Sequence, residues 1–335
     1  MILKSNFFLI FILIFIFSTF FIKKFKFFSK IINLYDSPDT FRKFHKEKVP
    51  LIGGFLFFLN FVILTIFSIV HGFEGVSNKL FFIFILVCFL FFFIGFLDDK
   101  FNISPNSKLI SFSILILLMI LSNDLFIVKN LNSILFNTNI QLANLSIFFT
   151  LTCILLFVNA FNMFDGINGQ SGIYLLVISL YLLTKNIFPF LVIVFIISSI
   201  FFLIGNLQNK FFLGNNGSYF LSFLISMILI YSYNIKKIEY VEEIFILMMI
   251  PGFDLLRVAF VRVYNGQHPF LPDRNHIHYL FKNYLTTGYT NLVLFILIAL
   301  PLLILFIFNS FLISLVIGTF LYIIIILFFK KFIKS

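Results

Sequence analysis

The sequence has 335 residues, of which 61% are hydrophobic and 11% are charged, and its mean hydropathy is +1.12. This composition excludes a soluble globular domain and indicates an all-α polytopic membrane protein. The net charge of +11 would suggest nucleic-acid binding in a soluble protein, but here it indicates basic cytoplasmic loops that face anionic lipid. We therefore expect membrane lipids, and no nucleic acid, as partners.

Eleven apolar runs are long enough to predict transmembrane helices. The first, residues 5–22, is too long for a signal peptide and is followed by lysines rather than by a cleavage site, which predicts a retained helix. No loop is long enough for a soluble domain, so residues 1–335 are expected to form a single membrane domain. The other ten runs lie near residues 50–70, 79–97, 108–122, 143–159, 171–185, 188–206, 218–233, 243–262, 290–308 and 310–328.

The charged residues predict the orientation of these helices. With segment 23–49 in the cytoplasm and alternating spans, eighteen Lys and Arg residues fall on the cytoplasmic side and six outside. The N-terminus is then outside and the C-terminus cytoplasmic. Carboxylates contribute little to orientation, so their shared side predicts an active site built from cytoplasmic loops. The acids and histidines on that side include Asp36, Asp98, Asp99, Asp165, Asp254, Asp273, His45, His268, His276 and His278.

An Asn-rich segment, NAFNMFDGING at 159–169, ends the fifth span abruptly. Asn159 and Asn162 share one face of a helix, and Asp165 continues that face before Gly166 breaks the helix. Polar groups at the end of a membrane helix are costly to place there and are often functional. The alternative is a helix end at which these side chains only cap backbone groups.

Two more polar clusters lie on the same predicted side. Asp98 and Asp99 are adjacent carboxylates, which repel each other and need a cation or strong hydrogen-bond donors nearby. Mg²⁺ bound together with phosphate oxygens would suit them, and so would a solvated helix end paired with Lys100. The segment KFFLGNNGS at 210–218 favours a backbone nest for an anion, with Lys210 as counter-charge, as much as a plain turn.

The segment HPFLPDRNHIHYLF at 268–281 is rich in groups that bind anions. Arg274 offers a planar fork for phosphate or carboxylate, and His276 and His278 share one face only if the segment is extended. No cysteine or third clustered ligand supports zinc, so contacts to a sugar diphosphate fit better. Residues 36–54 join a basic loop to a glycine pair at a helix entry, which is also typical of an ordinary positive-inside loop.

Together these motifs resemble the polyprenyl-phosphate N-acetylhexosamine-1-phosphate transferases, bacterial membrane enzymes of the glycosyltransferase 4 type. Such enzymes start O-antigen, enterobacterial common antigen or teichoic-acid linkage units. The resemblance runs from about residue 33 to 290, and the last signature is similar to that of the GlcNAc-1-phosphate branch. The residues that carry it are Asp36, Pro38, Arg42, Lys43, His45, Pro50, Gly53, Gly54, Asp98, Asp99, Asn159, Asn162, Asp165, Gly166, Gly214, Gly217, Ser218, Asp254, Arg257, Pro269, Pro272, Asp273, Arg274, His276 and His278.

The resemblance implies a reaction in the bacterial cytoplasmic membrane. A UDP-sugar gives its sugar 1-phosphate to undecaprenyl phosphate and UMP is released, with Mg²⁺ (or Mn²⁺) as cofactor; a homodimer is compatible with this class. The implied catalytic residues are Asp98, which would deprotonate or orient the lipid phosphate, Asp99 and Asp165. Metal binding is implied for Asp99, Asp165 and Asn215, and substrate binding for Lys43, His45, Asn159, Asn162, Asn168, Lys210, Arg274, His276 and His278.

Four positions depart from the family pattern. Asn102, Asn168 and Asn215 stand where many relatives have Asp, and Tyr279 where the final signature often has His. Asn215 is the most consequential, because an amide oxygen can ligate Mg²⁺ but adds no charge.

Two rival classes remain at this stage. A secondary transporter should carry its polar residues near the bilayer midplane rather than at one face. A CDP-alcohol phosphotransferase should carry several aspartates along one helix, whereas residues 167–185 contain no acid.

Overall fold

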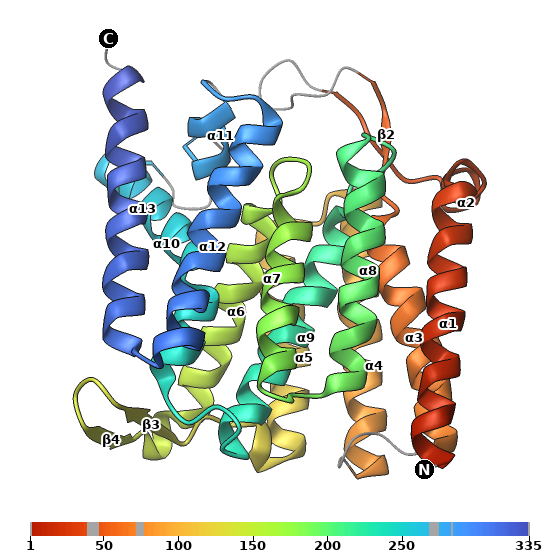
Figure 1. Cartoon of the computed structure of the whole chain (residues 1–335), viewed down its shortest axis with the longest axis horizontal. Coiled ribbons are helices and arrows are strands. Elements are labelled where there is room, and N and C mark those ends of the chain that lie inside the picture. Colours follow the sequence, from red (N-terminus) through yellow and green to blue (C-terminus); the bar gives the residue numbers. More distant parts are fainter. Residues whose placement is uncertain (1, 39–46, 72–76, 268–274, 283, 334–335) are drawn as a thin grey trace.

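The computed structural model describes residues 2–38, 47–71, 77–267, 275–282 and 284–333. Within them, eleven helices of 15 residues or more pack side by side in one bundle (Figure 1). Each predicted span matches one of these helices, with boundaries that agree within five residues. They are α1 (Ile2–Lys23), α3 (Gly53–His71), α4 (Asn78–Phe101), α5 (Pro105–Ser122), α6 (Ser146–Phe164), α7 (Gln170–Thr184), α8 (Pro189–Leu207), α9 (Gly214–Asn234), α10 (Val241–Tyr264), α12 (Thr287–Phe308) and α13 (Phe311–Ile333).

Length and composition qualify many of these helices as membrane spans. Among the described residues, seven helices are long and apolar enough to cross a membrane, and the bent pair α1–α2 makes an eighth if it counts as one span. Residues 53–69 and 170–184 form shorter apolar helices. The chain is therefore a multi-pass helical membrane protein, as its composition predicts.

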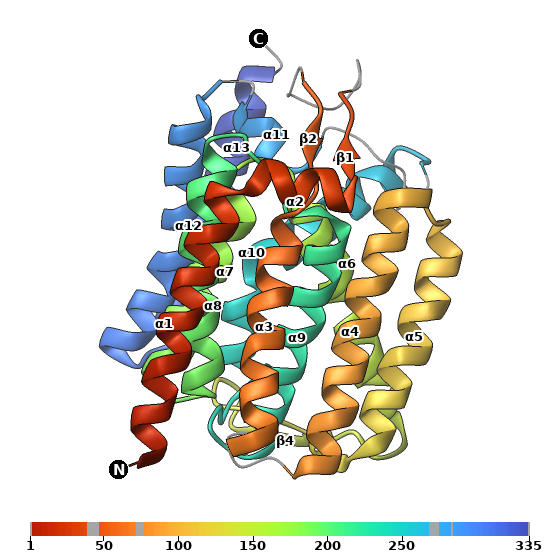
Figure 2. The same cartoon turned by 90° about the vertical axis from the view of Figure 1, so that its right-hand side faces the viewer.

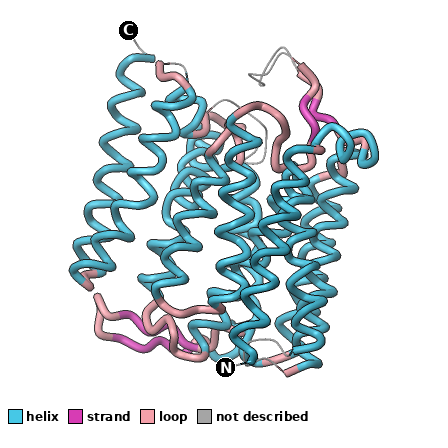
Figure 3. Tube along the Cα trace, turned by 45° about the vertical axis from the view of Figure 1, so that its right-hand side comes forward, coloured by secondary structure: helices cyan, strands magenta, loops and turns pink. Residues whose placement is uncertain are grey.

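Short elements that the sequence pattern did not predict lie at the two ends of the bundle. Helix α2 (Phe25–Ile32) turns 78° from α1 and lies across one end of the bundle (Figure 2). The strands form two antiparallel hairpins at opposite ends, β1 (Tyr35–Asp36) with β2 (Val49–Pro50), and β3 (Asn130–Ser133) with β4 (Thr138–Gln141) (Figure 3).

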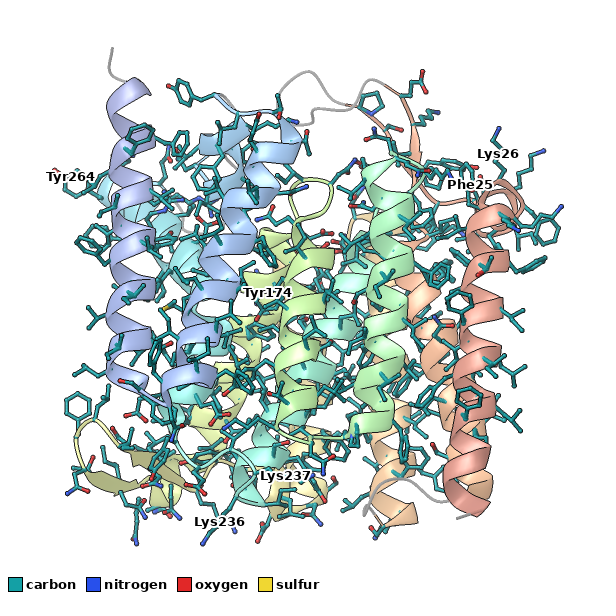
Figure 4. All side chains as sticks on the ribbon, in the orientation of Figure 1. Phe25, Lys26, Tyr174, Lys236, Lys237 and Tyr264 are labelled. Carbon is teal, nitrogen blue, oxygen red and sulfur yellow. The ribbon has the colours of Figure 1, made fainter. Side chains whose placement is uncertain are left out.

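The two ends of the bundle differ in what they carry. We call the end with α2, β1, β2 and the short helix α11 (Ile277–Lys282) the site face; α13 also ends there, whereas α1 begins at the opposite face (Figure 1). Lys236, Lys237 and the β3–β4 hairpin lie at the opposite face, and Tyr174 lies in the interior of the bundle (Figure 4). The buried Glu242 holds that hairpin through the Ser133 hydroxyl and the backbone N–H of Leu135.

Helix α9 is the central helix of the bundle, because every residue from 216 to 233 is buried. It packs against α3, α4 and α6. At Gly95 of α4, a Cβ atom would lie 2.5 Å from backbone atoms of Asn215 and Asn216, so only glycine allows α4 to approach the start of α9 this closely. This contact brings the end of α4 and the beginning of α9 together at the site face.

Candidate active site

A polar cavity of about 990 Å³ lies at the site face. Its described lining residues come from parts of the sequence that are far apart: Tyr35 to Ser37 with Leu51, Asp99 to Lys108, Asn162 to Asn168, Asn206 to Tyr219, and Arg262 with His276, His278, Tyr279, Lys282 and Thr287. The structure thus brings together residues from every predicted polar cluster. Among the described residues, the acidic, basic and histidine side chains that line it are Asp36, Asp99, Asp165, Lys100, Lys108, Arg262, Lys282, His276 and His278.

Asp98 is buried and its carboxylate accepts hydrogen bonds from four donors. Oδ1 accepts from the backbone N–H of Ile103 at 2.9 Å, and Oδ2 accepts from Lys108 at 3.1 Å, Asn215 at 2.9 Å and Tyr219 at 2.8 Å. These donors stabilise the ionised carboxylate although it is out of water. A role as base or orienting group for the lipid phosphate stays a prediction for Asp98. Sequence reasoning missed Lys108 and Tyr219 as its partners.

Asp99 lies at the start of α9 and caps it. Its Oδ1 accepts from the backbone N–H of Asn215 at 2.9 Å, and its Oδ2 accepts from the backbone and side-chain N–H groups of Asn216 at 3.1 and 2.6 Å. Segment 214–218 is therefore the first turn of a helix, and the anion that its amides bind is Asp99. The free N–H groups and the dipole of a helix N-terminus favour a carboxylate at this position.

Asn215 joins the acidic pair to the Asn-rich segment. Its Nδ2 donates to Asp98, and its Oδ1 accepts from Asn162 Nδ2 at 2.8 Å. A carboxylate only accepts hydrogen bonds, so the atom that faces Asp98 must be the amide nitrogen. Aspartate at position 215 could not make this contact in ionised form. The amide is thus the residue type that this hydrogen-bond network requires.

Asp165 directly follows α6 and lines the cavity near Asn162. Burial raises the pKa of the Asp165 carboxyl to about 6. A buried carboxyl of this kind is destabilised as an anion until a cation or another positive group approaches it.

A cluster of amides holds the loop after Asp165. Asn168 Nδ2 donates to Asn209 Oδ1 at 2.5 Å, and its backbone carbonyl accepts from Asn291 at 2.8 Å. Asn206 Oδ1 accepts from the backbone N–H of Gly169 at 2.6 Å. Sequence reasoning singled out only Asn168, because Asn206, Asn209 and Asn291 are far from it in the sequence and no local pattern reveals their shared target.

A buried ionic network surrounds His276. Asp254 of α10 contacts His276 Nδ1 at 2.8 Å and accepts from Arg257 at 2.6 Å and from the backbone N–H of Ile277 at 2.9 Å. On its other side, His276 Nε2 lies 3.4 Å from Arg262, which is only 2% exposed. Of this network, only His276 and Arg262 line the cavity.

His278 lies beside His276 at the start of α11, with ring centroids 5.8 Å apart and parallel planes. The two imidazoles share a face although the segment is not fully extended. At Gly166, a Cβ atom would lie 2.0 Å from His278 Nε2, so the absence of a side chain at this position gives the imidazole its room. The Asn-rich segment and the histidine segment therefore contact each other at the cavity.

Two further predicted site residues, Asn159 and Lys210, lie away from the cavity. Asn159 donates to the Leu155 carbonyl within α6, and the ammonium of Lys210 lies 5.8 Å from the Phe25 ring centroid; neither lines the cavity. Lys43, His45 and Arg274 lie outside the described residues.

The donor set of the cavity suits a hard cation. Oxygen atoms at its wall are offered by Asp99, Asp165, Asn162 and Asn215. Most of the side-chain oxygens of Asp99 and Asn215 already accept hydrogen bonds. No group of three His, Cys, Asp or Glu side chains with metal-binding spacing occurs within the described ranges. These residues fit Mg²⁺, because that ion is commonly held by one or two carboxylates together with substrate phosphates and water.

Comparisons with known proteins place this arrangement in context. Residues 81–233 match the model of glycosyl transferase family 4. The chain is similar to undecaprenyl-phosphate alpha-N-acetylglucosaminyl 1-phosphate transferases: it is 30% identical to that of Escherichia coli O157:H7 over 301 residues, which cover 86% of this chain and 78% of the relative. For the Escherichia coli K12 protein the identity is 29% with the same shares, and for the Haemophilus influenzae protein it is 30% with shares of 74% and 72%. The similarity extends well beyond the segment that the family model matches.

Proposed function

The chain belongs to glycosyl transferase family 4, and from this premise we propose that it transfers a sugar 1-phosphate from a UDP-sugar to undecaprenyl phosphate. The donor we propose is a UDP-N-acetylhexosamine, and the products are a lipid-linked sugar diphosphate and UMP. The relatives' name supports the lipid acceptor and an N-acetylglucosaminyl 1-phosphate group.

One observation carries this proposal: five separated polar segments line one cavity at one end of a bundle of apolar helices. A site at that position can receive a soluble nucleotide sugar from the aqueous side and a lipid phosphate from the membrane. A transporter would need its polar site near the bilayer midplane, and nothing in the described part of the chain favours that arrangement.

In the proposed reaction, an oxygen of the lipid phosphate attacks the sugar-side phosphorus of the donor. One P–O bond forms and the P–O bond to UMP breaks, so catalysis consists mainly of positioning and charge stabilisation. We assign the binding of donor phosphates to the histidine segment at the cavity, directly through His278 and indirectly through the arginine that His276 contacts, with Arg274 as a further candidate. Lys108, held by Asp98, is placed to attract the lipid phosphate.

Asp99 and Asp165, with Asn215, would hold Mg²⁺ at the cavity wall. The ion would supply charge neutralisation for the diphosphate group when bound. Asn162 and Asn168 are proposed to contact the nucleotide with the amide groups that line the cavity. Asn162 donates a hydrogen bond to Asn215, and Asn168 donates one to Asn209. These bonds orient both amides before the substrate binds.

We also propose eleven transmembrane spans in the bacterial cytoplasmic membrane, with the site face in the cytoplasm. Two observations support this count: the described residues contain eleven long helices, and α1 begins at the face opposite to the one where α13 ends (Figure 1). The excess of eighteen over six basic residues supports the orientation.

The test is an assay of purified protein with undecaprenyl phosphate, Mg²⁺ and a panel of UDP-sugars. We expect UMP release and a lipid-linked sugar diphosphate with at least one UDP-N-acetylhexosamine. Neither product from any donor on the panel would refute the proposed function.

A further inference from the structure

The contacts of His276 fix which of its nitrogens carries the proton. Its Nδ1 lies 2.8 Å from an oxygen of Asp254, and a carboxylate only accepts hydrogen bonds, so Nδ1 carries a proton. Its Nε2 lies 3.4 Å from Arg262, and a guanidinium only donates, so Nε2 is the acceptor. The neutral imidazole with a proton on Nδ1 satisfies both neighbours.

Asp254 belongs to this network but lies behind the residues that line the cavity. It is 1% exposed and does not line the cavity, and it also binds Arg257 and the backbone N–H of Ile277. Arg257 in turn donates to the Tyr322 hydroxyl of α13 at 3.0 Å. Helices α10 and α13 and the start of α11 thus fix Asp254, and among its described partners His276 is the one that lines the cavity.

We propose that Arg262 is an additional phosphate-binding residue of the cavity, and that Asp254 is a positioning residue that orients it through His276. Arg262 is a buried cation at the cavity wall, and its planar guanidinium can give two parallel hydrogen bonds to a phosphate. This inference rests on the proposed function, since the phosphates would be those of the nucleotide-sugar donor. Nothing in the spacing of the sequence distinguishes Arg262 from the other basic residues of the cytoplasmic side.

The first test compares binding by the parent protein and by Arg262→Lys in detergent. The probes are UDP-N-acetylglucosamine and inorganic pyrophosphate. Lysine keeps the charge but loses the planar fork, so we expect both probes to bind about 10-fold more weakly. Arg257→Lys is the matched control variant on the same helix. Arg257 contacts Asp254 directly but does not line the cavity. We therefore expect Arg257→Lys to lose less affinity for pyrophosphate than Arg262→Lys does. Lys129→Gln, which changes a surface pair with Asp124, should bind as the parent does.

The second test measures the protonation of His276 by ¹⁵N NMR, with its signal assigned by loss in His276→Gln. In Asp254→Asn, the new amide can donate to Nδ1, so we expect the proton to move to Nε2 and to face Arg262. Pyrophosphate affinity should then fall about as far as in Arg262→Lys, and the double variant should bind no more weakly than either single variant, because both changes act on one guanidinium. If Asp254→Asn does not fold, Arg262→Lys and His276→Gln still decide the proposal.

The outcomes separate this inference from the proposed function. Pyrophosphate binding by Arg262→Lys equal to that of the parent, or an unchanged His276 tautomer in Asp254→Asn, would overturn the inference. If the parent transfers sugar phosphate and Arg262→Lys keeps its KM, the inference alone fails. If the parent transfers nothing but binds pyrophosphate in an Arg262-dependent way, the inference stands and the proposed donor reaction fails.

Discussion

Substitution of Asn215 by Asp tests the charge balance of the site most directly. The amide nitrogen of Asn215 lies 2.9 Å from an oxygen of Asp98, so the substitution replaces a hydrogen bond with two facing carboxylates. The lost bond to a charged group is worth about 1.5–3 kcal/mol. At an effective dielectric constant of about 20, the repulsion between two unit charges 2.9 Å apart is about 6 kcal/mol.

Proton uptake limits this penalty. Protonating an ordinary aspartate at pH 7 costs about 4 kcal/mol, which is less than the repulsion, so the metal-free variant should take up a proton. We therefore expect Asn215→Asp to be destabilised by up to about 4 kcal/mol at pH 7 without metal. This loss of stability should be smaller at pH 5 than at pH 7, because a proton removes the repulsion between the carboxylates. At pH 7 it should also be smaller in Mg²⁺ than in EDTA, because a divalent cation has the same effect.

The assay is thermal unfolding of the detergent-solubilised protein, in EDTA or Mg²⁺, at pH 7 and pH 5. The chain has no Trp, so a thiol-reactive dye that detects exposure of the buried Cys88 is a suitable reporter once the exposed Cys153 is replaced by Ser. Asn215→Ala is the matched control, because it removes the hydrogen bond without adding a charge; its loss of stability should depend on neither pH nor Mg²⁺. Equal behaviour of the two variants under all four conditions would refute the reasoning.

Four further outcomes are expected. Asp99→Asn should abolish UMP release and lower the free energy of unfolding by about 1 kcal/mol, as for loss of a helix cap; near-normal turnover at limiting Mg²⁺ would exclude Asp99 as a ligand. Gly166→Ala should abolish transfer while the protein stays folded, because the new methyl group occupies the space of the His278 ring; the enzyme assay and gel filtration together check this. Because burial raises the pKa of Asp165 to about 6, the Mg²⁺ concentration for half-maximal UMP release should rise as the pH falls through 6, and a flat profile between pH 5 and 7 would count against Asp165 as a ligand. Reporter fusions should place the N-terminus outside and the C-terminus in the cytoplasm, and both ends on one side would refute an eleven-span count.

The sequence predicted the long helices well, because an apolar run of the length of a bilayer has few other stable conformations. Their polar ends were less predictable. Helix α4 continues through Asp98 and Asp99, and α9 already begins at Gly214, because each supplies the hydrogen-bond partners of the other. Such partners are 116 residues apart in the sequence and leave no local signal. Asn102 is a local exception: it ends α4 with a φ of 53°, a backbone conformation that Asn tolerates better than most residues.

The site was predictable as a gathering of polar segments but not as a set of contacts. Alternating spans place the aspartates, amides and histidines on one side, and the cavity does collect residues from all of these segments. The pairing of Lys108 with Asp98, and of Asp254 with His276, depends on how neighbouring helices are rotated about their axes. Helix rotation is set by packing along the whole bundle, which the spacing of a short motif does not encode.

The hydrogen bonds of the paired aspartates also set an order for biogenesis. When α4 leaves the ribosome, Asp98 can soon find Lys108 and the backbone N–H of Ile103, since both follow within ten residues. The donors that Asp99 uses, Asn215 and Asn216, are synthesised only after four more helices of the bundle. Until then Asp99 must stay hydrated at the membrane surface, because an unpaired carboxylate is costly in lipid. Docking of α9 is thus the step at which the end of α4 can leave water, and a ribosome-bound chain truncated before residue 215 should keep Asp99 accessible to solvent.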